Sequence, residues 1–363
     1  MTANPSRKHL VLIGAGRAHI QVLKGLARHG AANLSVTLVA PHPFYIEPGM
    51  LPGYVAGDYG LDDVRIPLDA LIEASGAAFL PAHVLTLDAA ARRVQLSSGD
   101  ALSYDVLSID QEPTPERELV EQYIPGARRN ALFIHPHMAF LQLWPQLQAL
   151  ARERALHVAV VVDDLAGAEL AMALAQALAA PHGSRVTLVA GEEPFLHEQP
   201  SALQRRVLAR LKAMNITLLQ DRCTGMDARA VQLASGASLQ CDAPLLALSA
   251  ATAPWLVSGG LQTDDMGMPV VNERLQSDSH RQVFIVPADA PAEVGPVLET
   301  NLRTALDGGS FKQAPLQARR LRVVGCGSGH AIAAWGPLGL EGREVWHFKV
   351  RRDRRQLAAL MSL

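Results

Sequence analysis

The chain has 363 residues, of which 49% are apolar and 19% charged, and its formal net charge at pH 7 is −2. This balance excludes a disordered chain, and the length predicts two or three domains. The near-neutral charge argues against nucleic acid as a partner, because phosphate binding needs a basic face. No apolar run approaches the about 20 residues of a membrane-spanning helix. The three cysteines, Cys223, Cys241 and Cys326, are too far apart to predict a disulfide scaffold, a zinc site or a redox pair.

The first forty residues predict a strand, a glycine turn, a helix and a second strand. Residues 9–13 form a mostly apolar run, which is typical of a buried parallel strand. The turn GAGRAH follows, residues 20–27 carry apolar side chains at helical spacing, and residues 36–40 (VTLVA) form the next strand.

The same pattern returns about 150 residues later. HVAVVV begins at His157, residues 164–180 have a helical pattern, and residues 186–190 are again VTLVA. Such a repeat indicates two βαβ units. The sequence therefore predicts an α/β fold with two tandem Rossmann-like domains and a small C-terminal α+β segment.

The remaining segments complete this organisation. Short strands are expected at residues 78–80, 82–87, 93–96, 106–109, 245–249 and 283–286, and helices at 138–151 and 295–306. The polar, proline-marked stretch 111–129 is predicted to be a linker. Residues 321–324 and 344–350 have a β pattern, and a basic helix closes the chain. We assign residues 1–125 and 265–318 to a discontinuous first domain, 126–264 to the second, and 319–363 to the C-terminal segment.

The first glycine turn predicts a dinucleotide site. Gly14 suits the tight turn, and Gly16 lets the backbone approach a pyrophosphate held at the helix N-terminus. The third glycine of the usual pattern is His19 here. The alternative is a Rossmann-type turn that binds nothing.

The second turn differs from the first. Aligned through Gly167, the first two glycine positions become Val162 and Asp164, with Asp163 between them. Two carboxylates repel a pyrophosphate, at roughly 1 kcal/mol per contact in water and about 4 at an effective dielectric near 20. We predict that these acids cap the helix and that they form no metal site. A dinucleotide site here is expected to be damaged.

Four further motifs leave alternatives open. Residues 44–53 (FYIEPGMLPG) could wall a flat cofactor or form a packed surface loop. Residues 325–330 (GCGSGH) favour a hairpin over a phosphate loop, with Cys326 as an apolar filler rather than a nucleophile. His135-Pro136-His137 is interpreted as a surface turn. The basic C-terminal helix could rest on a membrane surface or carry a solvated face.

Taken together, these features resemble type II NADH dehydrogenase-like, FAD-dependent pyridine nucleotide-disulfide oxidoreductases, in the branch associated with selenide, water dikinase. The matching motifs are the glycine turn ending in His19, the GMLPG loop at residues 49–53, LSYDVLSID at 102–110, AIAAWGPLGLEG at 331–342 and WHFK at 346–349. The resemblance implies that the first domain binds FAD and that the second is of the NAD(P)-binding type. It implies these flavin-contacting residues: Gly14, Gly16, Arg17, Ala18, His19, Pro48, Met50, Val84, Asp110 and Asp289.

The sequence also departs from that family at four motifs. Gln111-Glu112 replaces a Thr-Gly turn, the second glycine loop is lost, Pro287-Ala288-Asp289 replaces Ala-Gly-Asp, and no acid follows the first VTLVA. NAD(P)H binding is therefore doubtful.

Two hypotheses follow. The first is an FAD-dependent oxidoreductase that passes electrons from a reduced donor to a quinone or another small-molecule acceptor, in which the flavin carries the chemistry and no side chain acts as acid, base or nucleophile. The second is a degenerate flavoprotein fold without redox activity that acts as a binding or regulatory protein. In either case we expect a cytoplasmic protein, with peripheral membrane contact through the basic helix as one alternative.

Overall fold

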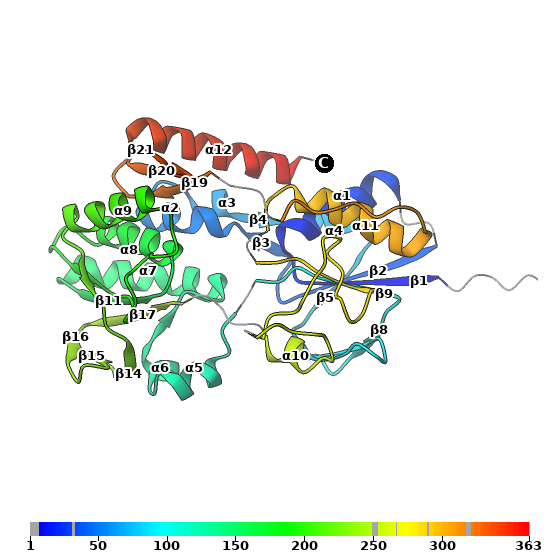
Figure 1. The fold of residues 1–363 in the computed structure, drawn as a ribbon, viewed down its shortest axis with the longest axis horizontal. Coiled ribbons are helices and arrows are strands. Elements are labelled where there is room, and N and C mark those ends of the chain that lie inside the picture. Colours follow the sequence, from blue (N-terminus) through cyan, green and yellow to red (C-terminus); the bar gives the residue numbers. More distant parts are fainter. Residues whose placement is uncertain are drawn as a thin grey trace, which may run out of the picture.

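The computed structural model describes residues 7–30, 33–112, 114–248, 253–265, 267–288, 290–316 and 321–362. Two parallel sheets of five strands lie side by side, each with helices on one face, and the C-terminal helix α12 (Arg343–Met361) extends along the top of both (Figure 1). The predicted α/β architecture is confirmed. Within the described residues no helix is long and apolar enough to cross a membrane.

The first sheet has the strand order β18-β9-β1-β2-β5. Alternate residues of β1 face opposite sides: Leu10 and Leu12 pack under helices, whereas Val11 and Ile13 pack against an antiparallel sheet and α10. The strands are β1 (Lys8–Ile13), β2 (Leu34–Ala40), β5 (Ala78–Pro81), β9 (Val106–Ile109) and β18 (Val283–Ile285). The helices are α1 (Arg17–His29), α4 (Asp69–Ser75) and α11 (Val294–Asp307); the other face carries β6 (Val84–Asp88), β7 (Arg93–Leu96), β8 (Ala101–Ser103) and α10 (Pro254–Val257).

The second sheet has the order β10-β17-β11-β12-β13 and is built in the same way. One face packs on α7, α8 and α9, and the other on β14, β15, β16 and α6. The strands are β10 (Leu132–Phe133), β11 (His157–Val162), β12 (Arg185–Val189), β13 (Thr217–Leu219) and β17 (Ala243–Ala247). The covering elements are α6 (Ala127–Asn130), α7 (His137–Glu153), α8 (Leu165–Ala177), α9 (Ser201–Ala213), β14 (Cys223–Met226), β15 (Ala230–Leu233) and β16 (Ser238–Gln240).

The internal repeat extends to individual hydrogen bonds. In the first unit the N–H of His9 donates to Asp105, and its Nε2 lies 2.8 Å from Thr37 Oγ1. In the second unit the N–H of His157 donates to an aspartate at 2.7 Å, and its Nε2 lies 2.8 Å from Thr187 Oγ1. The two sheets are therefore two copies of one βαβ design, as the sequence predicts.

The C-terminal segment is a three-stranded antiparallel sheet followed by α12. The strands β19 (Arg322–Gly325), β20 (Ala331–Trp335) and β21 (Leu338–Gly342) confirm the hairpin predicted around residues 325–330. The β pattern predicted at residues 344–350 is wrong, because this stretch is the first part of α12. Lys349, Asp353 and Leu357 recur every four residues on the buried face of that helix, and this helical period outweighs the β propensity of the aromatic residues beside them.

Two segments near the predicted boundaries pack as follows. Trp255, Leu256 and Leu261 pack with strands of the first sheet, so residues 253–261 belong with the first unit rather than the second. The predicted linker 111–129 contains α5 (Arg117–Tyr123) and most of α6, and Ile124 is buried with the second unit. The intervening segment of the first unit forms β3 (Phe44–Ile46), the 3₁₀ turn η1 (Pro48–Met50), α2 (Leu51–Ala56), α3 (Leu61–Val64) and β4 (Arg65–Pro67).

A candidate cofactor cleft between the two sheets

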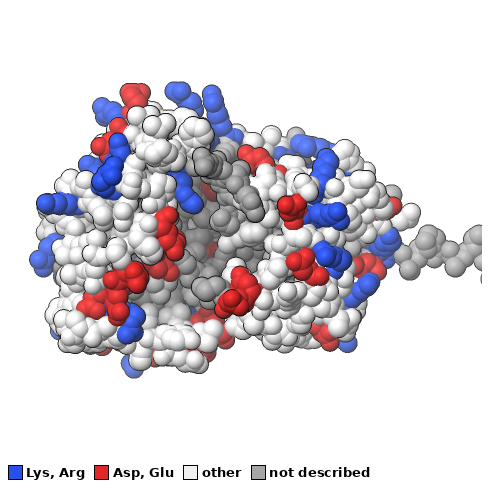
Figure 2. Space-filling model, in the orientation of Figure 1, with Lys and Arg blue, Asp and Glu red and all other residues white. Residues whose placement is uncertain are grey.

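A cleft of about 1350 Å³ opens between the two units. It is walled by the turn after β1, the loop 44–52, the start of α7, the start of α8 and the buried side of α12. Figure 2 shows this hollow between the two halves, with acidic side chains on both sides of it. Small-molecule sites typically enclose about 300–1,000 Å³, so the cleft has room for a dinucleotide-sized ligand.

Two glycines let the end of β9 pack against the turn after β1. Gly14 has φ +91°, and a Cβ there would lie 2.4 Å from the backbone of Asp110 and Gln111. Gly16 is the N-cap of α1, and a Cβ there would lie 2.3 Å from the Asp110 carboxyl group. The glycines predicted for backbone approach are therefore needed for contact within the chain itself.

Asp110 caps helix α1 from the neighbouring strand. Its carboxylate accepts hydrogen bonds from the backbone N–H of Ala18 at 2.7 Å and of His19 at 3.0 Å, and its carbonyl accepts from Gly16 N–H at 2.9 Å. Gly16 itself offers no side-chain cap. The positive end of α1 is thus held by a carboxylate of this chain, which is the charge that a helix N-terminus favours.

His19 lies behind the turn and not in the lining of the cleft. The residue is fully buried; its Nδ1 lies 2.7 Å from the carbonyl of Gly14 and its Nε2 lies 2.8 Å from Ser108 Oγ. Burial lowers the pKa of His19, although Asp110 and the Gly14 carbonyl act in the opposite direction. Through these two contacts the imidazole supports the turn, at the position where the usual pattern has a third glycine.

The structure brings most of the predicted cofactor residues to the cleft. The following eight line it: Gly14, Gly16, Arg17, Ala18, Pro48, Met50, Val84 and Asp110. Asp289 lies outside the described residues. Loop 44–53 is no surface loop, since Met50 and Leu51 are buried and α2 packs on α8. Within it Glu47, which is 9% exposed, pairs with Arg17.

The second turn carries its own cap. Asp164 is the N-cap of α8, and its Oδ1 accepts a hydrogen bond from Gly167 N–H at 2.8 Å, which confirms the capping role predicted for this residue. Gly167 is required for close packing, because a Cβ there would lie 2.6 Å from Val162 Cγ1. Asp164 also lines the cleft and adds negative charge to it.

A buried charged group in the cleft escaped the sequence analysis. Lys349 on α12 lies 2.8 Å from Asp353 and 3.7 Å from Glu169 of α8, and each of these side chains is 13% exposed or less. Tyr59 donates to Asp353, and Gly325 N–H donates to Glu169. Two carboxylates share one ammonium, and burial raises the pKa of Glu169 despite its contact with Lys349.

A charged residue in an otherwise apolar helix was the available signal for Glu169. The segment AGAELAMALA is apolar apart from that glutamate. Lys349 and Asp353 form an i,i+4 pair, but the β pattern predicted for residues 344–350 concealed it. Cys326, by contrast, is fully buried with its pKa raised by burial to about 12, as expected for an apolar filler.

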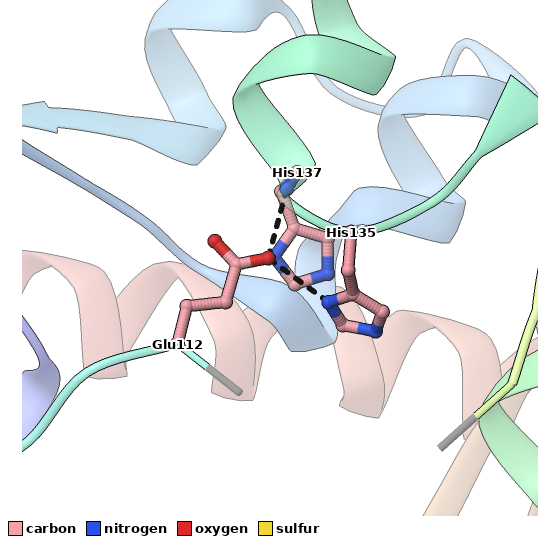
Figure 3. A group of neighbouring side chains, drawn as sticks. All are labelled: Glu112, His135 and His137. Carbon is pink, nitrogen blue, oxygen red and sulfur yellow. Dashed lines mark hydrogen bonds and ion pairs between the residues drawn. The ribbon is translucent and has the colours of Figure 1, made fainter. Parts of the chain in front are cut away.

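A second cluster stands where the sequence has Gln111-Glu112. Glu112 Oε1 lies 2.9 Å from His135 Nδ1 and 2.8 Å from His137 Nδ1 (Figure 3). The surface turn predicted for His135-Pro136-His137 is therefore wrong: His137 is 5% exposed, and all three residues line the cleft. Burial raises the pKa of Glu112, but its contacts with both imidazoles outweigh burial and lower the pKa to about 2.

Comparison with known proteins assigns the family. A model of the pyridine nucleotide-disulphide oxidoreductases matches residues 8–287, and the chain belongs to that family. An NADH dehydrogenase-like protein of Mycobacterium tuberculosis is 28% identical over 297 residues, which cover 77% of this chain and 70% of the relative. A type II NADH:quinone oxidoreductase of Staphylococcus haemolyticus is 27% identical over 104 residues, 28% of this chain and 26% of the relative.

Solved structures share the fold at low sequence identity. The sulfide:quinone oxidoreductase of Aquifex aeolicus superimposes with a TM-score of 0.77 at 18% identity, over 97% of this chain and 91% of the other. The structure of NDH2 from Plasmodium falciparum in complex with NADH gives 0.76 at 11% identity, over 98% and 97%. The arrangement of both sheets is therefore that of known oxidoreductases.

Proposed function

We propose that the protein is an FAD-dependent oxidoreductase that passes electrons from a reduced donor to a quinone or another small-molecule acceptor. The observation that carries the proposal is the glycine turn at the N-terminus of α1, which opens into a cleft of dinucleotide size between two Rossmann-like units. The family of the chain and its NADH:quinone oxidoreductase and sulfide-quinone reductase relatives support the same class of reaction.

The cleft is large enough for a flavin dinucleotide. The backbone of residues 14–18 would hold its pyrophosphate region, and the apolar loop at Pro48 and Met50 would wall its ring system together with Val84. Bound there, the flavin would supply the capacity to take up and release electrons. Arg17 brings a positive charge to this wall, although Glu47 pairs with it.

Glu169 and Lys349 are the side chains placed to handle a proton in the cleft. Lys349 is paired with Asp353, which leaves Glu169 as a second carboxylate beside a charge that is already balanced. Its raised pKa favours a proton on the carboxyl at pH values where an exposed glutamate has lost it. The carboxyl of Glu169 can therefore hold a proton for an acceptor that becomes reduced in the cleft.

The nicotinamide dinucleotide site is the weaker part of the proposal. Asp164 fills the N-terminus of α8 with its own carboxylate, and no small residue at position 162 frees the backbone there. A phosphate at this terminus would meet a like charge. We infer that NAD(P)H binds poorly and that another reduced donor serves the enzyme.

The C-terminal segment offers a surface for peripheral membrane contact. At a membrane the protein would have access to a quinone. Trp335, Leu338 and Leu340 on the β20–β21 hairpin are 55%, 66% and 72% exposed, and Phe348 follows on α12. Arginines at positions 351, 354 and 355 add positive charge to that helix. Co-sedimentation with anionic vesicles tests the contact, and Leu338→Asp with Leu340→Asp should abolish it.

The first experiment is the visible absorbance spectrum of the purified protein, before and after incubation with FAD. We expect a flavin spectrum that persists through gel filtration and bleaches little when NADH is added anaerobically. Gly16→Ala should lose the flavin, because its Cβ would displace the Asp110 carboxyl into the cleft. The matched control is Gly60→Ala: Gly60 is also an extended N-cap glycine, but a Cβ there meets only Asp63, at 3.5 Å.

The outcomes separate the proposal from its rival. One observation favours a degenerate flavoprotein fold that acts as a binding or regulatory protein: Asp110 already occupies the N–H groups at the start of α1. A protein that takes up no FAD under any condition supports that rival. Flavin retention that is equal in Gly16→Ala and wild type overturns the assigned position of the cofactor.

A further inference from the structure

Glu112, His135 and His137 have the composition of a metal site, although the sequence analysis predicted none. Among the described residues, one ligand atom from each of the three lies within 4.8 Å of the others. Both imidazoles turn Nδ1 toward the same carboxylate oxygen, and the second oxygen of Glu112 points away from the rings (Figure 3). Two imidazoles and one carboxylate are donors shared by Zn²⁺ and other divalent transition metals.

The contact between Glu112 and His137 is close without being a hydrogen bond. The two atoms are 2.8 Å apart, yet His137 Nδ1 is buried and has no hydrogen-bond partner in the described part of the chain. The same carboxylate oxygen accepts from the backbone N–H of His137 at 2.8 Å. A nitrogen held 2.8 Å from a carboxylate oxygen, outside hydrogen-bond geometry, is an arrangement that two ligands of one cation can adopt.

The separations require only a small adjustment around a metal ion. Donor atoms of a tetrahedral zinc site, with bonds of about 2.0–2.2 Å, lie about 3.4 Å from one another. The observed distances of 2.8 and 2.9 Å are therefore short by roughly half an ångström. The side chains of Glu112 and His135 are 30% and 20% exposed toward the cleft and can move by that amount.

We propose that Glu112, His135 and His137 bind one divalent transition-metal ion at the wall of the cleft. The three residues line the cleft, so the remaining coordination position faces it and is open to water or to a small ligand. One ligand, Glu112, comes from the beginning of the segment after β9, and the two histidines come from the start of α7, so the site joins the two units. It does not depend on the proposed flavin chemistry, because none of its ligands is assigned to the cofactor.

Equilibrium dialysis and calorimetry of the tag-free full-length protein with Zn²⁺ test the site. We expect one equivalent to bind. Glu112→Gln and His135→Gln should each weaken binding at least about tenfold, since loss of even an outer partner costs about 10–100-fold in affinity. The buried His137 stays in place so that the fold is kept. His197→Gln is the matched control, because His197 is exposed and its ring lies at hydrogen-bond distance from the carbonyl of Pro194. The Zn²⁺ affinity of this variant should equal that of wild type.

Co²⁺ supplies a second readout that does not depend on activity. We expect the visible d–d bands of a nitrogen- and oxygen-ligated ion, lost in Glu112→Gln, without the charge-transfer band that a cysteine ligand would add. No stoichiometric Zn²⁺ binding overturns the proposal. Equal affinity in wild type and both variants also overturns it, as does a thiolate band, which would place the metal on the buried cysteines.

Discussion

The N-termini of α1 and α8 solve the same problem in two ways. Each helix follows the first strand of a βαβ unit and opens into the cleft, and each N-terminus is satisfied by a carboxylate of the chain. At α1 the carboxylate is Asp110, which reaches across from β9 to a glycine turn. At α8 it is Asp164, the residue that begins the helix.

This difference shows what the glycines of the first turn contribute. At α1 the two glycines of the turn have no side chain, so the neighbouring strand end can pack on them, and the same turn lines the cleft. At α8 the glycine that remains, Gly167, serves only the packing of helix on strand. The backbone at the start of α1 can therefore be approached from the cleft. At the start of α8 the side chain of Asp164, which caps its own helix, takes that place.

The two helices also differ at the position two residues after His19 and the aligned Gly167. Gln21 of α1 packs against Gly295 of α11, whereas the matching residue of α8, Glu169, faces Lys349 of α12. Lys349→Met should have the largest effect, a loss of about 3–5 kcal/mol in the free energy of unfolding, because Asp353 would keep a buried charge without its cation. Urea denaturation of the variant and of Gln21→Ala, where the loss should be far smaller, measures the contrast.

A double variant identifies the cause of that loss. Lys349→Met with Asp353→Leu removes both members of the closer pair and should recover most of the stability, since apolar replacement of a buried ion pair is often neutral. A double variant that is no more stable than Lys349→Met would show that packing of the lysine stem, rather than its charge, is what α12 contributes.

The caps themselves supply the second prediction. Asp110→Ala leaves two backbone N–H groups of α1 without their acceptor and should cost roughly 2 kcal/mol, whereas Asp164→Ala leaves one and should cost about 1 kcal/mol. The two losses should add in the double variant, because the sites share no partner. Urea denaturation at constant pH measures all three variants. A larger loss for Asp164→Ala would reverse the proposed comparison.

The repeat was predictable because hydrophobic runs and turns are local signals. Strands β1, β2, β11 and β12 lie in the two repeated strand–turn–helix–strand units, each of which ends in VTLVA. Capping of α8 by Asp164 is equally local and was also predicted. The capping of α1 was not predictable, since Asp110 lies 92 positions from Ala18 and meets it only through the order of strands in the sheet.

The two side-chain clusters in the cleft were also not predictable from local sequence. Glu112 meets His135 across 23 positions, and Lys349 meets Glu169 only because α12 lies back over the second unit. Sequence spacing detects metal or acid–base pairs on one helix or in one loop, and these groups come from separate elements. The residues of the glycine turn were found because they are contiguous; those opposite them became visible only in the fold.

The smallest effect expected concerns pH and the imidazole beneath the first turn. His19 is neutral when folded because burial lowers its pKa below the ordinary value of 6.5. Below pH 6.5 the unfolded chain binds a proton that the folded chain does not, so this contribution to stability is complete above pH 6.5 and is lost as the pH falls.

The variant His19→Gln removes this proton linkage while it keeps polar atoms near Ser108. It should be less stable than wild type at pH 8, because glutamine fits the site less well, and the difference should shrink as the pH falls from 6.5 to 5. His157, which begins the second repeat, also has its pKa lowered by burial but is partly exposed, so His157→Gln should show a weaker effect of the same sign. Urea denaturation at several pH values measures both. Parallel curves for wild type and His19→Gln would mean that folding does not lower the pKa of His19, which would contradict this prediction.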